Sequence, residues 1–150
     1  MPGLRGGEEK AMKQDAKTYL KEIWGKQQQI ERLKKRRAAL HLDVSFGSID
    51  YSADKVQNSP KNKLEEAAVK LYERIEKIDN TIARLSVEVD DRIGSIEALN
   101  NESHRDLLFK RYVEGKSFEK ISVEMHYVYN YTCNLHGKAL KELSEHLNFS

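Results

Sequence analysis

The sequence LEEAAVKLYERIEKIDNTIARLSVEV, residues 64–89, carries the most regular hydrophobic pattern of the chain. Its apolar residues recur in alternating steps of four and three through nearly four heptads, which is the pattern of a coiled-coil seam. We therefore predict one long coiled-coil helix over residues 61–99. The seam consists of Leu64, Ala68, Leu71, Ile75, Ile78, Ile82, Leu85 and Val89.

The register of this seam changes after Val89, because the next apolar residue, Ile93, follows by four where a step of three was due. Either the seam drifts around the helix or the helix is interrupted near Gly94. A seam of this length also needs a partner. The preceding helix, folded back antiparallel as a helical hairpin, is the local candidate, and a second copy of the chain is the other.

That preceding helix is predicted over residues 15–42, where Tyr19, Ile23, Ile30, Leu33 and Leu40 recur at helical spacing. Lys26 and Arg37 occupy seam positions, whereas Leu20 and Trp24 widen the apolar face, so more than one neighbour is expected. Residues 1–14 are expected to form a flexible tail. Residues 1–42 hold 11 basic and 5 acidic side chains. Such a segment can bind phosphates or an acidic protein face, although a solvated helix surface is the more frequent explanation of a basic cluster.

Composition limits the class of protein. The chain has 150 residues, a single-domain length, with 33% charged and 39% hydrophobic residues, which favours long helices that bury one stripe each. No apolar run approaches a membrane span, and the beginning lacks the apolar block of a signal peptide, so we expect a cytoplasmic protein with no membrane partner. The single cysteine, Cys133, excludes an internal disulfide. Residues 43–60 are rich in Ser, Gly, Asp and Asn and are predicted to form a loop, with Pro60 in the first turn of the next helix.

Residues 101–150 predict three shorter helices. Asn101 or Ser103 can cap the first, over residues 105–113, and Ser117 caps the second, over residues 118–125. The third runs from about Tyr129 to His146. A helix, a tight turn, a short helix, a break and a longer helix are typical of a helix-turn-helix, so the whole chain is expected to be all-α.

The stretches DLLFKRYVEGKSFEKIS (106–122) and LHGKALKEL (135–143) resemble the last domain of bacterial sigma factors. The chain is more similar still to late-operon activators and autolysin regulators of Gram-positive phages and prophages, which share the long helical N-terminal part and a loop like DKVQNSP (54–60). The resemblance covers most of residues 15–145. It implies a transcriptional regulator of phage or prophage late genes that binds double-stranded DNA, works with host RNA polymerase at the nucleoid, and is not an enzyme.

In a helix-turn-helix the last helix reads base edges through its N-terminal residues. Asn side chains can pair with adenine, while Tyr and Lys can hold phosphates. The outward face of this helix is expected to include His136 and Gly137 as well. The predicted DNA-binding residues are Tyr129, Asn130, Tyr131, Cys133, Asn134, Lys138, Lys141, Lys116 and Lys120.

Several residues depart from the sigma-like pattern. His126 stands where the turn usually has Gly, Val128 where a Ser or Thr cap is usual, and Thr132 where a branched apolar core residue is usual. The first turn of the last helix is therefore expected to be irregular and capped at Asn130. Because the reading face lacks Arg, DNA binding by one head is expected to be weak, with dimerisation or RNA polymerase adding affinity.

Two chemical interpretations are set aside and two functional alternatives stay open. His126, Cys133 and His136 on one short helical unit are ordinary surface and turn residues far more often than metal ligands, and no third group completes a Cys133–His136 catalytic pair, so no metal, cofactor or catalytic residue is assigned. One alternative is an oligomeric DNA-packaging subunit of the small-terminase type. The other is a protein-binding module that uses the sigma-like fold without reading DNA, which the net neutral residues 101–150 favour.

Overall fold

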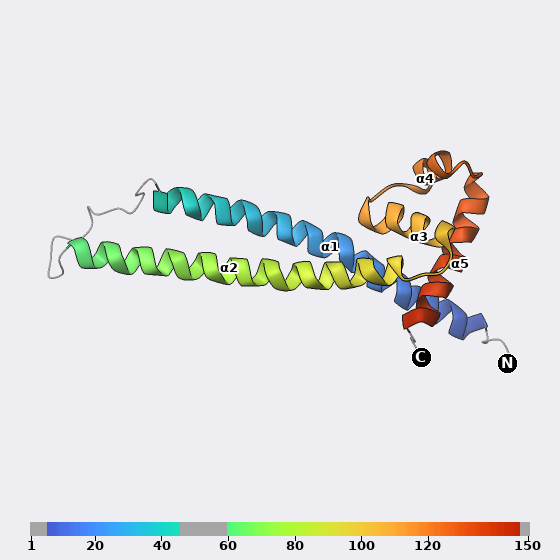
Figure 1. Ribbon diagram of the computed structural model, residues 1–150, viewed down its shortest axis with the longest axis horizontal. Coiled ribbons are helices and arrows are strands. Elements are labelled where there is room, and N and C mark those ends of the chain that lie inside the picture. Colours follow the sequence, from blue (N-terminus) through green and yellow to red (C-terminus); the bar gives the residue numbers. More distant parts are fainter. Residues whose placement is uncertain (1–5, 46–59, 148–150) are drawn as a thin grey trace. The chain divides into compact units, whose positions relative to one another are not determined.

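The computed structural model describes residues 6–45 and 60–147, and every regular element in these ranges is a helix, as the all-α prediction requires. Most of the predicted loop, residues 43–60, lies outside them. No helix of the described ranges is long and apolar enough to cross a membrane. The elements, drawn in Figure 1, are α1 (Gly6–Ser45), α2 (Pro60–Glu97), α3 (Glu102–Leu108), the π-helix η1 (Phe109–Val113), α4 (Phe118–Met125) and α5 (Tyr129–Leu147).

The chain divides into two compact units. The smaller unit is Gln28–Ser86, and the larger unit combines Met1–Gln27 with Val87–Ser150. Each unit has buried apolar side chains of its own.

Helix α1 begins earlier than the sequence pattern suggested. It starts at Gly6, so residues 6–14, expected to be a flexible tail, are helical. Two features of this stretch favour a helix: Glu8 and Glu9 lie in the first turn, where carboxylates interact well with the helix dipole, and Glu9 pairs one turn on with Lys13 at 3.3 Å. The extension adds more than two turns to the larger unit.

Helix α2 begins at Pro60, where a first-turn proline was predicted, and continues without interruption through Gly94 to Glu97. Of the two explanations for the change in register, an interruption at Gly94 is therefore wrong. Beyond Val89 the buried positions move to Ile96 and, just after the helix, Leu99. The stripe thus turns around the helix axis, as a step of four in place of three requires.

In the smaller unit the predicted seam lies on the inner side of α2. Ile75, Ile78 and Leu85 are buried, as is Ile30 of α1, whereas Leu64, Leu71 and Ile82 are half-buried. Arg37 of α1, a charged residue at a seam position, donates hydrogen bonds from its guanidinium to both carboxylate oxygens of Asp79 on α2. A cross-helix ion pair therefore explains why an arginine interrupts the apolar stripe.

In the larger unit the remaining parts of α1 and α2 run antiparallel. The hydroxyl of Tyr19 lies 3.0 Å from that of Ser95, and further along α1 the ammonium of Lys26 lies 2.9 Å from a carboxylate oxygen of Glu88. Arg92 stacks over the ring of Tyr19 with 4.3 Å from its guanidinium carbon to the ring centre. Lys26, the second charged seam residue, is thus also paired across the two helices.

The C-terminal part of the larger unit is a compact set of helices in which α3 and α4 both pack against α5 (Figure 1). The side chain of Asn101 caps α3 by accepting from the His104 amide, and that of Ser117 caps α4 by accepting from the Lys120 amide, each at 3.2 Å. The core residues of these helices are Leu107, Leu108, Tyr112, Ile121, Leu135, Ala139, Leu140 and Leu143, all buried.

Candidate nucleic-acid interface

The turn between α4 and α5 is tight and well closed. His126 ends α4 in the left-handed conformation, with φ 60° and ψ 39°. The amide of the next residue, Tyr127, donates back to the carbonyl of Ser122 at 2.9 Å, and the His126 amide donates to Val123 at 3.3 Å. Helices that end with this pair of hydrogen bonds usually have glycine at the left-handed position. His126 adopts the same turn geometry, but its β carbon makes the left-handed conformation cost free energy.

Helix α5 begins at Tyr129, and the predicted cap at Asn130 is wrong because Asn130 already lies within the first turn. The carbonyl of Val128 accepts the Thr132 amide at 3.0 Å and the Thr132 hydroxyl at 3.2 Å. Thr132 is fully buried, and its hydroxyl also lies 2.9 Å from that of Ser122 on α4. This buried hydroxyl pair fixes α4 against the start of α5 in place of an apolar contact.

The N-terminal half of α5 presents an exposed polar surface. Tyr129 and Tyr131 are each 47% exposed, and Asn130 and Asn134, one turn apart, are exposed as well. Cys133 is half-buried, and its hydrogen bond raises the pKa of the Tyr129 phenol. The structure therefore brings together five of the predicted DNA-binding residues on one stretch of one helix.

The four predicted lysines divide into two pairs. Lys116 is held by Glu114 and by Glu124, and hydrogen bonds to these two carboxylates raise its pKa. Lys141 lies 3.6 Å from Glu9 of α1. Lys120 and Lys138 are exposed, and no carboxylate within the described ranges pairs with either. Of the four, only these two have an ammonium group free for a phosphate.

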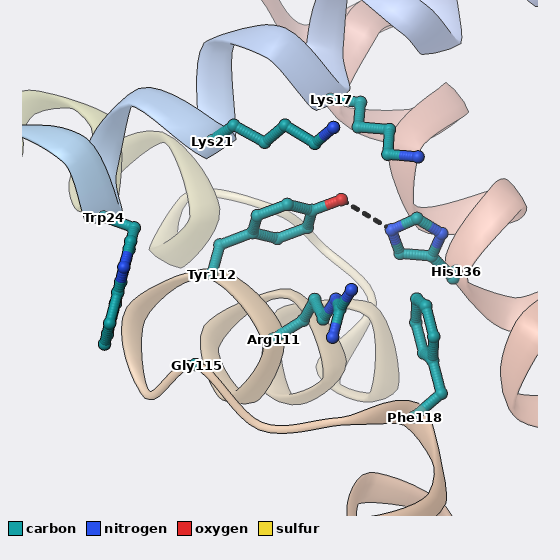
Figure 2. Close-up of a pocket in the computed structure, with 8 residues that line it drawn as sticks. All are labelled: Lys17, Lys21, Trp24, Arg111, Tyr112, Gly115, Phe118 and His136. Atoms are coloured by element: carbon teal, nitrogen blue, oxygen red, sulfur yellow. Dashed lines mark hydrogen bonds between the residues drawn. The ribbon is translucent and has the colours of Figure 1, made fainter.

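His136 does not lie on the outward face of α5, where the sequence pattern placed it. Its Nε2 lies 2.7 Å from the hydroxyl of Tyr112, and its ring packs edge-on against Phe118 with 4.9 Å between centres (Figure 2). Burial, and then the nearby charges of Lys17 and Arg111, lower the pKa of His136 to about 4, so the imidazole is neutral near pH 7. Burial raises the pKa of Tyr112 to about 12.

The N-terminal turns of α1 also contact α5 near His136. A β carbon on Gly137 of α5 would lie 3.8 Å from the ammonium of Lys13 on α1, and Glu9 reaches Lys141 one turn further along α5. These turns therefore contact α5 around Gly137, which was expected on its outward face, and Lys141, which was predicted to bind DNA. The acidic first turn and the four-residue spacing of Glu9 and Lys13 were the available signals for this helical extension.

Within the described ranges no three His, Cys, Asp or Glu side chains are grouped so that they could hold a metal ion. Searches among protein-family models, curated proteins and solved structures find no match to this chain. A functional assignment therefore rests on the residues and geometry of the larger unit.

Proposed function

We propose that the chain is a sequence-specific DNA-binding transcriptional regulator whose α4 and α5 form a helix-turn-helix. The observation that carries this proposal is the division of α5 into an exposed polar face and a buried face. Its N-terminal half exposes Tyr129, Asn130, Tyr131 and Asn134, while Leu135 and Ala139 behind them are buried against the other helices. Such a helix can enter a major groove with its first turns while its supporting helices stay outside the groove.

The side chains on this surface suit base and phosphate contacts. Asn130 and Asn134 would each offer the paired donor and acceptor that recognise adenine. The phenols of Tyr129 and Tyr131 would donate to phosphate oxygens, which positions the helix without reading sequence. Lys138 on α5 and Lys120 on α4 would neutralise phosphates on either side.

The same proposal gives the rest of the chain a supporting role. The antiparallel contacts of α1 with α2 suit a helical hairpin, and its exposed surface could join two copies so that two heads meet two half-sites. From the resemblance to late-gene regulators, the genes would be phage or prophage late genes and RNA polymerase the protein partner. The proposal assigns no catalytic role to any residue.

The test is a triple variant that removes the reading groups. Asn130→Ala, Asn134→Ala and Lys138→Ala together should abolish enrichment of one short sequence from a genomic fragment library. The matched control replaces two amides and a lysine that are exposed in the smaller unit, Gln29→Ala, Asn80→Ala and Lys70→Ala, and should bind like the unaltered chain. Circular dichroism of both variants checks that helicity is unchanged, and intact binding by the first variant would refute the assignment of α5.

A second candidate is a protein-binding module, favoured by two exposed apolar side chains beside the turn. Val123 is 75% exposed and Val128 is 73% exposed, whereas DNA contacts are mostly polar and cationic. A double substitution, Val123→Ser with Val128→Ser, separates the two functions. It should leave DNA binding within about threefold if α5 reads DNA, since neither valine carries a hydrogen-bonding group, and it should weaken capture of RNA polymerase if the patch is the docking surface.

A further inference from the structure

A cavity of about 570 Å³ lies in the larger unit between α1 and the helices that support α5. This volume is in the range of small-molecule sites. Figure 2 shows Lys17, Lys21 and Trp24 reaching it from α1, with Arg111 and Phe118 opposite and His136 at one side. None of the residues predicted to bind DNA lines this cavity.

The cavity wall is strongly cationic. Three of its side chains, Lys17, Lys21 and Arg111, are positively charged, and no carboxylate lines it. No acidic residue of the described ranges forms an ion pair with Lys17 or Lys21. The pKa of His136 is lowered first by burial and then by the charges of Lys17 and Arg111, so both cations act on the same side of the cavity. Three cations around one concave surface attract an anion.

Arg111 is held in place before any ligand arrives. One of its terminal nitrogens donates to the carbonyl of Lys116 at 3.0 Å, and its guanidinium carbon lies 4.4 Å from the centre of the Phe118 ring. It also belongs to η1, the π-helix that continues α3. Single π turns within helices are frequent at functional sites, and a preset guanidinium loses little freedom on binding a phosphate.

The other wall offers an aromatic ring. Trp24 is 50% exposed although its ring packs on the backbone of Gly115, where a β carbon would lie only 3.0 Å from Cζ3 of the indole. Gly115 also has φ +71°, a conformation that suits glycine. The close contact supports one side of the indole, and the exposed area remains available for stacking with a planar ring.

We propose that this cavity binds a free mononucleotide, with its phosphate on Lys17, Lys21 and Arg111 and its base against Trp24. Cationic groups and an aromatic surface at opposite sides of one cavity match the two chemical parts of a nucleotide. The ligand would contact α1 and η1 together and so stabilise the docking of α1 on the helices around α5. The site does not depend on whether α5 binds DNA.

Trp24 is the only tryptophan of the chain, so its fluorescence reports this cavity alone. The full chain is titrated separately with adenosine monophosphate, guanosine monophosphate, inorganic phosphate and a short DNA duplex. We expect saturable quenching by at least one nucleotide, at least about tenfold tighter than the response to inorganic phosphate, because stacking adds to phosphate binding.

Variants locate the binding. The double variant Lys17→Gln with Lys21→Gln should lower the affinity for the nucleotide by at least about tenfold. The control is Lys10→Gln with Lys35→Gln, which alters two exposed lysines of the same helix outside the cavity and should leave that affinity unchanged. Circular dichroism confirms that each variant folds. A second readout is the pKa of His136 measured by NMR and assigned with His136→Gln, which a bound phosphate should raise from about 4.

Four results would each overturn the proposal. They are no quenching at millimolar nucleotide, equal affinity for inorganic phosphate and nucleotide, an equal loss in the Lys10 and Lys35 control, or a tight response to the duplex with none to free nucleotide. The last result would replace the small ligand with a backbone phosphate of DNA.

Discussion

The hydroxyl of Tyr112 lies 2.7 Å from Nε2 of His136, and this imidazole is held neutral beside two cationic side chains, those of Lys17 and Arg111. Its pKa is about 4 in the folded chain, against 6.5 for an ordinary histidine. The unfolded chain therefore binds more protons than the folded chain between these two pH values. The contribution of the neutral His136 imidazole to the free energy of unfolding is therefore fully present above pH 6.5 and is lost as the pH falls toward 4.

We accordingly expect the free energy of unfolding to fall by on the order of 3 kcal/mol between pH 6.5 and pH 4 through this residue. Urea unfolding at a series of pH values measures the change. His136→Gln should flatten this part of the profile, and His146→Gln, which alters an exposed histidine of the same helix, should keep it. A His136→Gln profile identical to that of the unaltered chain would show that this group titrates normally.

A second prediction concerns the left-handed residue between α4 and α5. His126 has φ 60°, a conformation that costs a residue with a β carbon about 1–2 kcal/mol and costs glycine little. Although glycine loses more chain entropy on folding, relief of this strain is the larger effect, so His126→Gly should raise the free energy of unfolding by about 1 kcal/mol. Chemical denaturation monitored by circular dichroism measures the change.

The matched control is Lys120→Gly, which puts glycine at an exposed position of the first turn of α4, where φ is that of an ordinary helix, and should lower stability by up to about 1 kcal/mol. If His126→Gly also destabilised the chain, its imidazole would have to make a contact that outweighs the backbone cost.

A third prediction tests the seam of α2. Ile75 is buried and Ile82 half-buried in the smaller unit, and a carboxylate at either position would lose hydration without a partner. Ile75→Asp with Ile82→Asp should lower the free energy of unfolding by about 3 kcal/mol or more, with a loss of helicity visible by circular dichroism.

Val69→Asp with Val87→Asp provides the comparison, because these branched residues of α2 are 55% and 59% exposed. This pair should keep both stability and helicity. Light scattering on both variants shows whether a second copy is involved. A fall in mass for the exposed pair alone would place a second copy on the outer face of α2 and would contradict the inner seam as the main contact.

The sequence predicted those elements whose determining residues lie close together in the chain. The bounds of α4 and the start of α5 were predicted correctly because a serine cap, a turn and a local apolar pattern all lie within a few residues. The bidentate pair of Arg37 with Asp79 was not predicted, because Arg37 was seen only as an irregularity in its own stripe. A cross-helix partner 42 residues away leaves no local trace.

For the candidate site, too, features set by local sequence were predictable and contacts between distant residues were not. The exposed residues of α5 follow from helical periodicity, whereas the inward position of His136 depends on contacts with Tyr112 and Phe118, which belong to other helices. The pairing of Lys116 with Glu124 was likewise missed, since it depends on how the turn before α4 folds back. The cavity beside Trp24 joins residues far apart in the chain and is a property of packing alone.

The last prediction concerns the charges on the proposed DNA-binding surface. Each phosphate neutralised by a lysine contributes a slope of about −0.9 to the logarithm of the binding constant against the logarithm of salt concentration. With only Lys120 and Lys138 unpaired on this surface among the described residues, one head should show a slope of about −2. Fluorescence anisotropy of a labelled operator at several salt concentrations measures it.

Two single variants distinguish an engaged lysine from a paired one. Lys120→Gln should reduce the magnitude of the slope by about one, and Lys116→Gln should leave it unchanged because Glu114 and Glu124 already neutralise that ammonium. A slope as steep as about −5 would require further cations, such as those of the first half of α1, on the DNA. The DNA-binding surface would then extend beyond the helix-turn-helix.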